Sequence, residues 1–152
     1  MAGMIGALLC LYLATDAQAP AWLGVWRFEP TQSSFAAGPP PFIRATRRVE
    51  SSSHGIRLIE ELVRPRGGVT HLEWTGALDG SEARVHGVDL FVTYAYRQVD
   101  DRTLEGVVKV DGRVTSRSRE TVSEDGQTLT IQTIGENAQQ GLRSTMVFLR
   151  RE

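Results

Sequence analysis

The sequence predicts an all-β protein, a single antiparallel up-and-down β-barrel of about 8–10 strands. Three observations support this class. Period-2 stretches rich in Val, Ile, Thr, Tyr and Phe recur at short intervals, turn residues separate them, and no long segment after the N-terminal run has helical periodicity. A barrel is favoured over a sandwich because closure removes edge strands, whose unpaired N–H and C=O groups attract other chains.

Residues that favour turns bound each expected strand. The strands are expected at residues 24–28, 43–52, 56–64, 69–78, 90–99, 103–110, 113–122, 128–134 and 142–150. Positive-φ positions are offered by Ser53-His54-Gly55, Arg66-Gly67-Gly68, Asp79-Gly80, Asp111-Gly112 and Asp125-Gly126. Asp111-Gly112 has the chemistry of a two-residue type I′ hairpin turn. Residues 30–41 interrupt the β pattern, and we expect a loop or one short helical turn there, leading into the extended Pro39-Pro40-Pro41.

The composition is that of one globular domain with an N-terminal appendage. The 152 residues are 41% hydrophobic and 23% charged, with 17 Lys and Arg against 18 Asp and Glu. This balance removes the electrostatic argument for a nucleic-acid-binding or polybasic membrane-surface protein. The one cysteine, Cys10, lies in the N-terminal apolar run, so a chain without that run has no thiol nucleophile, disulfide or cysteine-ligated metal. We expect no cofactor and no metal site.

The N-terminal 19 residues have the features of a signal peptide. The uncharged run 4–14 has 11 residues, about half of the roughly 20 that a membrane-spanning helix needs. Small residues at suitable spacing predict cleavage after Ala17 or Ala19. A lipid anchor at Cys10 and a buried first helix are disfavoured, because no small residue precedes the cysteine and the run has no amphipathic stripe. We therefore expect an exported bacterial protein, periplasmic or extracellular, with its barrel at 20–152.

Several expected strands carry polar and apolar side chains on the same face. Glu60 shares a face with Leu58 and Leu62, and Glu120 shares one with Val122. Such mixing is typical of a small barrel with an amphipathic interior. Two arrangements remain open, a ligand-sized cavity and an interior filled by side chains.

The string from Gly24 to Pro30, Gly-Val-Trp-Arg-Phe-Glu-Pro, resembles the start of small secreted bacterial lipocalin-like proteins of unassigned function. Ser33, Ser34 and Phe35 after it, and the runs 99–105, 109–114 and 122–130, are similar to the same group. The resemblance implies a lipocalin-like, calycin-type barrel. In it, Trp26 of the Gly-x-Trp tripeptide closes one end and Gly24 allows close backbone approach. The Thr-Asp-Tyr string of true lipocalins is missing, and Arg143 is the candidate for the arginine of their third motif.

The predicted function is non-enzymatic binding of a small apolar or amphipathic molecule in the barrel interior. Large side chains at the centre of mixed-face strands are the candidates for ligand contact: Leu72, Trp74, Tyr94 and Tyr96. The alternative is a filled barrel that acts through its outer surface, as an envelope-associated interaction or structural protein. A small hydrolase or isomerase is the least favoured hypothesis.

The candidate catalytic groups favour a binding protein over an enzyme. His71 and Glu73 lie on one face of an expected strand, where zinc binding or acid–base chemistry is conceivable, but this face is expected to be the solvated one. No serine stands in a nucleophile-elbow context. Arg117 and Arg119 are expected to lie outside the barrel, since a buried unpaired guanidinium is costly.

Overall fold

The structure, a computed structural model, describes residues 19–152. The predicted leader, apart from its last residue, lies outside the described residues. The elements in chain order are β1 (Gly24–Phe28), η1 (Pro30–Gln32), β2 (Ser34–Phe35), β3 (Arg44–Ser52), β4 (Gly55–Val63), β5 (Val69–Gly76), β6 (Asp79–Arg84), β7 (Val92–Asp100), β8 (Thr103–Val110), β9 (Arg113–Val122), β10 (Thr128–Gly135), η2 (Asn137–Gln139) and β11 (Arg143–Arg150). Among the described residues, neither helical turn is long and apolar enough to cross a bilayer.

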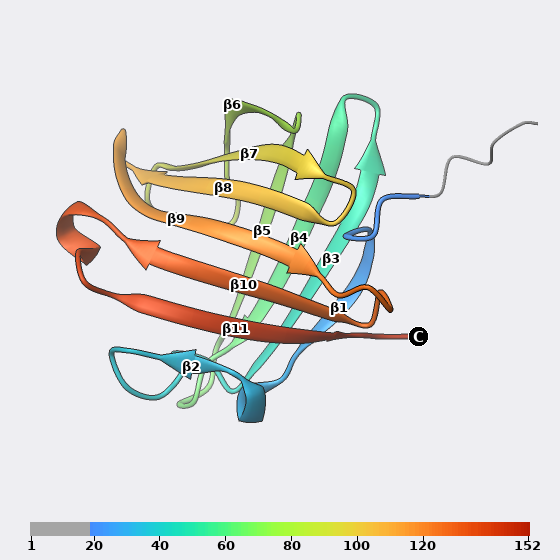
Figure 1. The fold of residues 1–152 in the computed structure, drawn as a ribbon. Coiled ribbons are helices and arrows are strands. Elements are labelled where there is room, and N and C mark those ends of the chain that lie inside the picture. Colours follow the sequence, from blue (N-terminus) through green and yellow to red (C-terminus); the bar gives the residue numbers. More distant parts are fainter. Residues whose placement is uncertain (1–18) are drawn as a thin grey trace, which may run out of the picture.

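The strands form one antiparallel sheet that curls into a nearly closed barrel (Figure 1). The pairing order is β5-β4-β3-β1-β11-β10-β9-β8-β7-β6, so the chain meanders up and down and its first and last long strands lie side by side. The two-residue β2 pairs with β11 next to the segment that pairs with β1, and so extends the same wall. The all-β, up-and-down barrel predicted from the sequence is confirmed.

The barrel closes between β5 and β6 through one bridge and one side chain. Glu73 and His86 exchange two backbone hydrogen bonds, with N–O distances of 3.0 and 2.8 Å. The Trp74 indole N–H on β5 donates to the carbonyls of Ala83 and Tyr94 across the seam, at 3.1 and 3.2 Å. A tryptophan side chain therefore joins the two strand edges where the backbone ladder is missing.

One stretch of the chain departs from the expected pattern. Asp79-Gly80 was expected to form a turn, but it begins β6, a strand missed because five of its six residues are exposed and Ala83 is its one apolar side chain. The strand was therefore not visible as an alternation of apolar and polar residues. By contrast, Asp111 and Gly112 have φ of 49° and 79°, and the predicted two-residue hairpin between β8 and β9 is confirmed.

Residues at every second position of the long strands point inward and build the core. It contains the large aromatic side chains and the branched aliphatic ones, among them Trp22, Trp26, Phe28, Phe42, Leu58, Leu72, Trp74, Tyr96, Leu104, Val122, Leu129, Ile131 and Phe148. Phe28 lies edge-to-face with Phe42, Phe148 and Phe35, at centroid distances of 4.8, 5.7 and 6.4 Å. This packing fills much of the interior.

Candidate functional site

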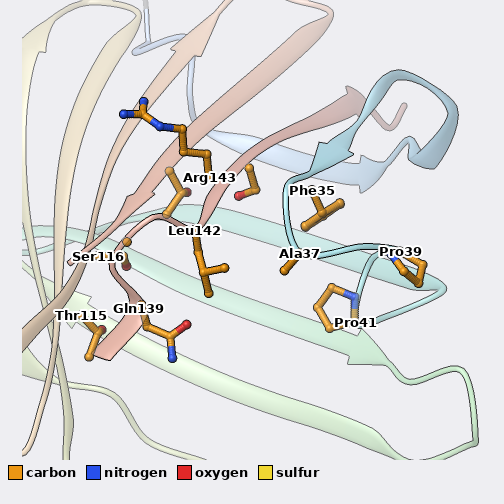
Figure 2. A pocket seen from close by; sticks show the side chains of 12 residues that line it. Phe35, Ala37, Pro39, Pro41, Thr115, Ser116, Gln139, Leu142 and Arg143 are labelled. Carbon is orange, nitrogen blue, oxygen red and sulfur yellow. The ribbon is translucent and has the colours of Figure 1, made fainter. Parts of the chain in front are cut away.

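One end of the barrel holds a pocket of about 600 Å³ (Figure 2). We call this end the mouth. The pocket lies between the start of β11, the facing ends of β9 and β10, and the segment after β2. Its lining residues are Phe35, Ala37, Pro39, Pro41, Thr115, Ser116, Thr133, Gly135, Gln139, Leu142, Arg143 and Ser144. The volume is within the range of roughly 300–1,000 Å³ typical of small-molecule sites.

The inward-facing residues at the mouth are small, and this leaves the space unfilled. Ser116, Thr133 and Ser144 come from three adjacent strands, and each continues an inward alternation that carries larger groups deeper in the barrel. Phe35, Leu142 and the prolines add apolar surface around these hydroxyl groups. The pocket can thus hold an apolar body and offer hydrogen bonds to a polar atom.

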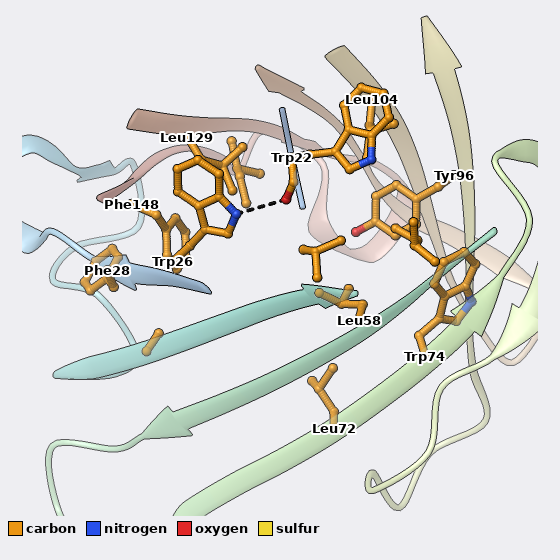
Figure 3. Close-up of a cluster of buried hydrophobic side chains, with 14 of the residues drawn as sticks. Trp22, Trp26, Phe28, Leu58, Leu72, Trp74, Tyr96, Leu104, Leu129 and Phe148 are labelled. Atoms are coloured by element: carbon orange, nitrogen blue, oxygen red, sulfur yellow. Dashed lines mark hydrogen bonds between the residues drawn. The ribbon is translucent and has the colours of Figure 1, made fainter. Parts of the chain in front are cut away.

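The opposite end, which we call the closed end, is sealed by aromatic side chains (Figure 3) and by one arginine. The Trp26 ring is fully buried, and its indole N–H donates to the Trp22 carbonyl at 3.0 Å. The Arg150 guanidinium lies 4.2 Å from the centre of the Trp26 ring and donates to the carbonyls of Ala21, Leu23 and Gly126 at 2.6, 2.9 and 2.6 Å. Arg150 therefore covers Trp26, whereas Arg143, the candidate for the arginine of the third lipocalin motif, lies at the mouth.

Gly24 is required where these groups meet. Its φ is +136°, and a Cβ on it would lie 2.4 Å from Nη1 of Arg150. A side chain at this position would displace the guanidinium from its three carbonyl acceptors.

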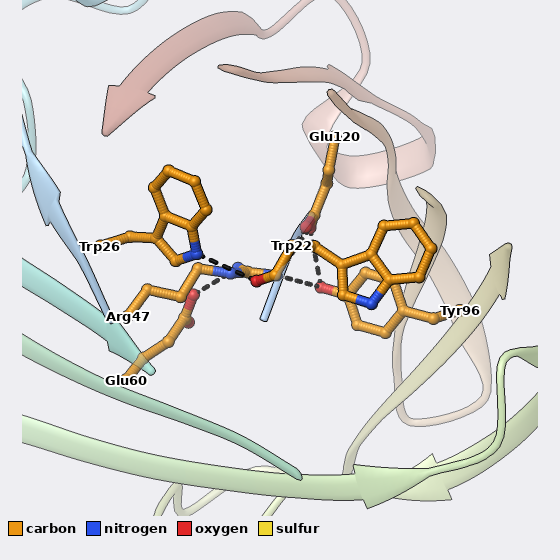
Figure 4. A network of polar contacts seen from close by, with 6 residues as sticks. All are labelled: Trp22, Trp26, Arg47, Glu60, Tyr96 and Glu120. Carbon is orange, nitrogen blue, oxygen red and sulfur yellow. Dashed lines mark hydrogen bonds and ion pairs between the residues drawn. The ribbon is translucent and has the colours of Figure 1, made fainter. Parts of the chain in front are cut away.

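A buried ionic cluster of Arg47, Glu60, Tyr96 and Glu120 lies inside the barrel (Figure 4). Arg47 Nη1 donates to Glu60 Oε1 at 2.6 Å. Arg47 Nη2 donates to both Glu120 oxygens, at 2.7 and 2.9 Å, and Tyr96 also donates its O–H to Glu120 Oε1 at 3.0 Å. The Arg47 and Glu120 side chains are only 6% and 4% exposed, and Glu60 is 14% exposed. The cluster therefore joins side chains from β3, β4, β7 and β9, although these strands do not all pair with one another.

The cluster shifts the protonation of its members. Burial lowers the pKa of Arg47, but the surrounding Glu120, Tyr96 and Glu60 together raise it well above its ordinary value, so the guanidinium stays charged. Burial raises the pKa of Glu120, and the nearby Glu60 charge adds to this against the attraction of Arg47. Glu120 therefore holds its proton more tightly than an ordinary glutamate.

The four residues predicted to contact a ligand lie deep in the barrel, and none of them lines the mouth pocket. Leu72, Trp74 and Tyr96 are buried in the core, whereas Tyr94 is partly exposed. The Tyr94 ring lies edge-to-face with Tyr96 at 6.1 Å, and burial raises the pKa of its hydroxyl. Ligand contact by these four residues stays a prediction.

The polar groups considered for catalysis lie on the outside. His71 is half exposed, and its Nε2 lies 3.1 Å from Glu73 Oε1; this hydrogen bond raises the pKa of the imidazole. The described part of the chain contains no group of three or more His, Cys, Asp or Glu side chains placed to hold a metal ion. Arg117 and Arg119 are exposed and pair with Glu136 and Glu105, so their predicted outward orientation is confirmed.

Arg47 was not singled out from the sequence, although a signal for it exists. The Ser52–Gly55 hairpin register places Arg47 directly opposite Glu60, and Arg47 alternates with the apolar Ala45 and Val49. An arginine and a glutamate paired across a hairpin, each on an apolar face, indicate a buried ion pair. The contact with Glu120, 73 residues away, has no such local signal.

No family model matches the sequence, and no curated protein is similar to it in sequence. Among solved structures, the zebrafish ileal bile acid-binding protein, crystallised with cholic acid, is similar at a TM-score of 0.51 and 10% sequence identity. The match covers 86% of this chain and 99% of that chain. The likeness shows that the two proteins share a fold, the calycin-type β-barrel.

Proposed function

We propose that this protein binds a small apolar or amphipathic molecule at the mouth and in the adjoining interior of its barrel, without performing chemistry on it. The observation that carries the proposal is the pocket of about 600 Å³ at an end where the inward side chains are small. The zebrafish protein of the same fold holds cholic acid, a small amphipathic molecule, which supports this class of ligand.

Partly buried apolar side chains near the mouth support an amphipathic ligand. Leu62, Val92, Tyr94 and Met146 are partly buried and pack against the core on the mouth side. Ser116 and Thr133 contribute hydroxyl groups to the pocket lining. A ligand with an apolar body and a small number of polar atoms fits this distribution.

We also propose that the protein is exported and meets its ligand outside the cytoplasm. The support is the uncharged run 4–14 followed by small residues. Mass determination of the mature protein from its own host tests this, because a cut after Ala17 or Ala19 gives two distinct masses.

The binding proposal is tested with Nile red, an uncharged fluorescent probe, and with native mass spectrometry of protein purified gently from the host envelope. We expect saturable fluorescence enhancement and an adduct of a small molecule that disappears on organic extraction. Ser116→Phe, which fills the pocket, should abolish probe binding. Thr121→Phe, on the outer face of the same strand, is the matched control and should leave binding unchanged.

The alternative function, a filled barrel acting through its outer surface, is favoured by the dense packing of the closed end. Repeated preparations without adduct, together with no saturable probe binding, would support it over the carrier proposal.

A further inference from the structure

The buried cluster bears on the kind of head group that the interior accepts. On the basis of the proposed ligand-binding function, we infer that the barrel takes amphiphiles whose head group is neutral or cationic and donates hydrogen bonds, such as an alcohol or an amine. The same site disfavours carboxylates. Four features of the cluster lead to this selectivity: its position, the occupancy of its guanidinium, its net charge and a free carboxylate oxygen on Glu60.

The cluster lies at the end of a polar track that begins in the mouth pocket. Ser116, Ser118 and Glu120 are alternate residues of β9 and point inward. At about 3.3 Å per residue, Glu120 is roughly 13 Å along the strand from Ser116. A head group that advanced from the pocket along this face would meet the Ser116 and Ser118 hydroxyl groups first, then Glu120 and its neighbour Glu60, whose side chain is 14% exposed.

The guanidinium at the end of this track is already occupied. Both terminal nitrogens of Arg47 donate to carboxylates, one to Glu60 at 2.6 Å and the other to Glu120 at 2.7 and 2.9 Å. The third nitrogen, Nε, has no partner among the described residues but is sealed from solvent. A ligand carboxylate would have to replace a protein carboxylate to gain the bidentate contact that makes arginine an anion site.

The charge of the cluster is not positive in either protonation state of Glu120. With Glu120 protonated, Arg47 balances Glu60, and with Glu120 ionised the three groups sum to one negative charge. An incoming carboxylate would lose its hydration without gaining a compensating charge, which is unfavourable inside a protein.

Glu60 supplies the acceptor for a donating head group. It is the most exposed member of the ion-paired trio, at 14%, and within the described residues its Oε2 receives no protein hydrogen bond. A hydroxyl or ammonium group placed beside it would donate to this free oxygen and would be stabilised by any excess negative charge.

The test measures how well three probes displace Nile red from the mature protein at neutral pH. The probes are dodecan-1-ol, dodecylamine and dodecanoate, which differ only in their head groups. We expect the alcohol and the amine to displace the dye at concentrations about tenfold or more below that needed for dodecanoate, because only the acid brings an unpaired negative charge. Equal or tighter binding of dodecanoate would overturn the inference while leaving the binding function intact. Failure of all three probes, with no dye binding, would instead overturn the proposed function.

Two neighbouring glutamates provide a matched pair of variants. Glu60→Gln removes the inward negative charge and should reduce the preference for the amine over dodecanoate by about tenfold. Glu61→Gln, at the next position on β4 but 59% exposed on the outer face, should leave the preference unchanged. Unfolding curves of both variants establish that they are folded, and an unchanged preference in folded Glu60→Gln would contradict the role of this carboxylate.

Discussion

The two ends of the barrel differ in the size of the side chains that point inward. At the closed end, Trp22 and Trp26 are buried and Arg150 is held by three backbone carbonyls. At the mouth, the inward residues are small and the rim is apolar. Seven large hydrophobic side chains are exposed in the described part of the chain, and all except Val99 lie at the mouth: Ile43, Val69, Leu90, Phe91, Ile134 and Leu142. One end therefore provides stability and the other leaves room for a partner molecule.

The buried ionic cluster lies between the closed end and the mouth. Arg47, Tyr96 and Glu120 are as buried as the core and Glu60 is partly buried, and the hydrogen bonds of these polar groups tie β3, β4, β7 and β9 together. Removing one partner of such a cluster is expected to be more disruptive than replacing an exposed ion pair. Four substitutions, ordered from the largest expected effect to the smallest, test this division of the molecule.

Trp26→Ala should have the largest effect on folding. Because the ring is fully buried, its loss should lower the free energy of unfolding by about 3–5 kcal/mol, measured by urea denaturation. Val99→Ala, at an exposed position of the same end, is the control and should change it little. A Trp26→Ala midpoint close to that of the wild type would show that this end does not carry the stability of the barrel.

Glu120→Gln should change how stability depends on pH. The pKa of Glu120 is raised in the folded state, so its contribution to stability is fully present below its ordinary value of 4.5 and is lost as pH rises through the folded-state pKa. The difference in unfolding free energy between the variant and the wild type should therefore shift in favour of the variant as pH rises above 4.5, by up to about 1.4 kcal/mol per pH unit until that pKa is reached. Urea denaturation at a series of pH values measures this difference.

The exposed Glu124→Gln serves as the control for the pH series and should follow the wild-type profile. If the difference between Glu120→Gln and the wild type is constant with pH, burial does not govern the protonation of Glu120.

Gly112→Val should destabilise the hairpin at the mouth by about 1–2 kcal/mol, because a β-branched residue is strained at a positive φ. The relevant φ is +79°, and a Cβ there would meet no neighbouring atom, so backbone strain alone would produce the loss. Asp111→Asn, which tolerates the same backbone region, should leave the thermal midpoint nearly unchanged. Wild-type stability of Gly112→Val would mean that the turn adopts another type.

Leu142→Ala should have the smallest effect on folding and a larger one on binding. The side chain is 41% exposed and lines the pocket, so we expect a change in stability within about 0.5 kcal/mol and weaker Nile red binding. A loss of stability comparable to that of Trp26→Ala would remove the distinction between the two ends.

Most of the fold could be predicted from local patterns in the sequence. The Asp111-Gly112 hairpin was predictable because a two-residue type I′ loop depends on the residues within it. Strand β6 was not, because its position at the seam follows from pairing with β7 on one side alone, and its exposed residues show no apolar alternation.

The candidate site was predictable only in part. The mixed faces containing Glu60 and Glu120 indicated an amphipathic interior, and in the structure Trp74, Tyr94 and Tyr96 are part of the core or pack against it. The mouth pocket was not anticipated, because it depends on Ser116, Thr133 and Ser144 meeting across three strands, and small side chains give no signal in a single strand.

By itself, the sequence determined the strand alternation and most of the turns, since each depends on residues close together in the chain, whereas the role of Trp26 was implied only by the resemblance to lipocalin-like proteins. Only the tertiary structure decided that Arg47 would meet Glu120, 73 residues away, and that Arg150 would cover Trp26. The physical reason is that a charged side chain favours an oppositely charged or polar partner, but its charge does not determine which residue that partner is. Barrel closure, by setting the position of every strand, makes that choice.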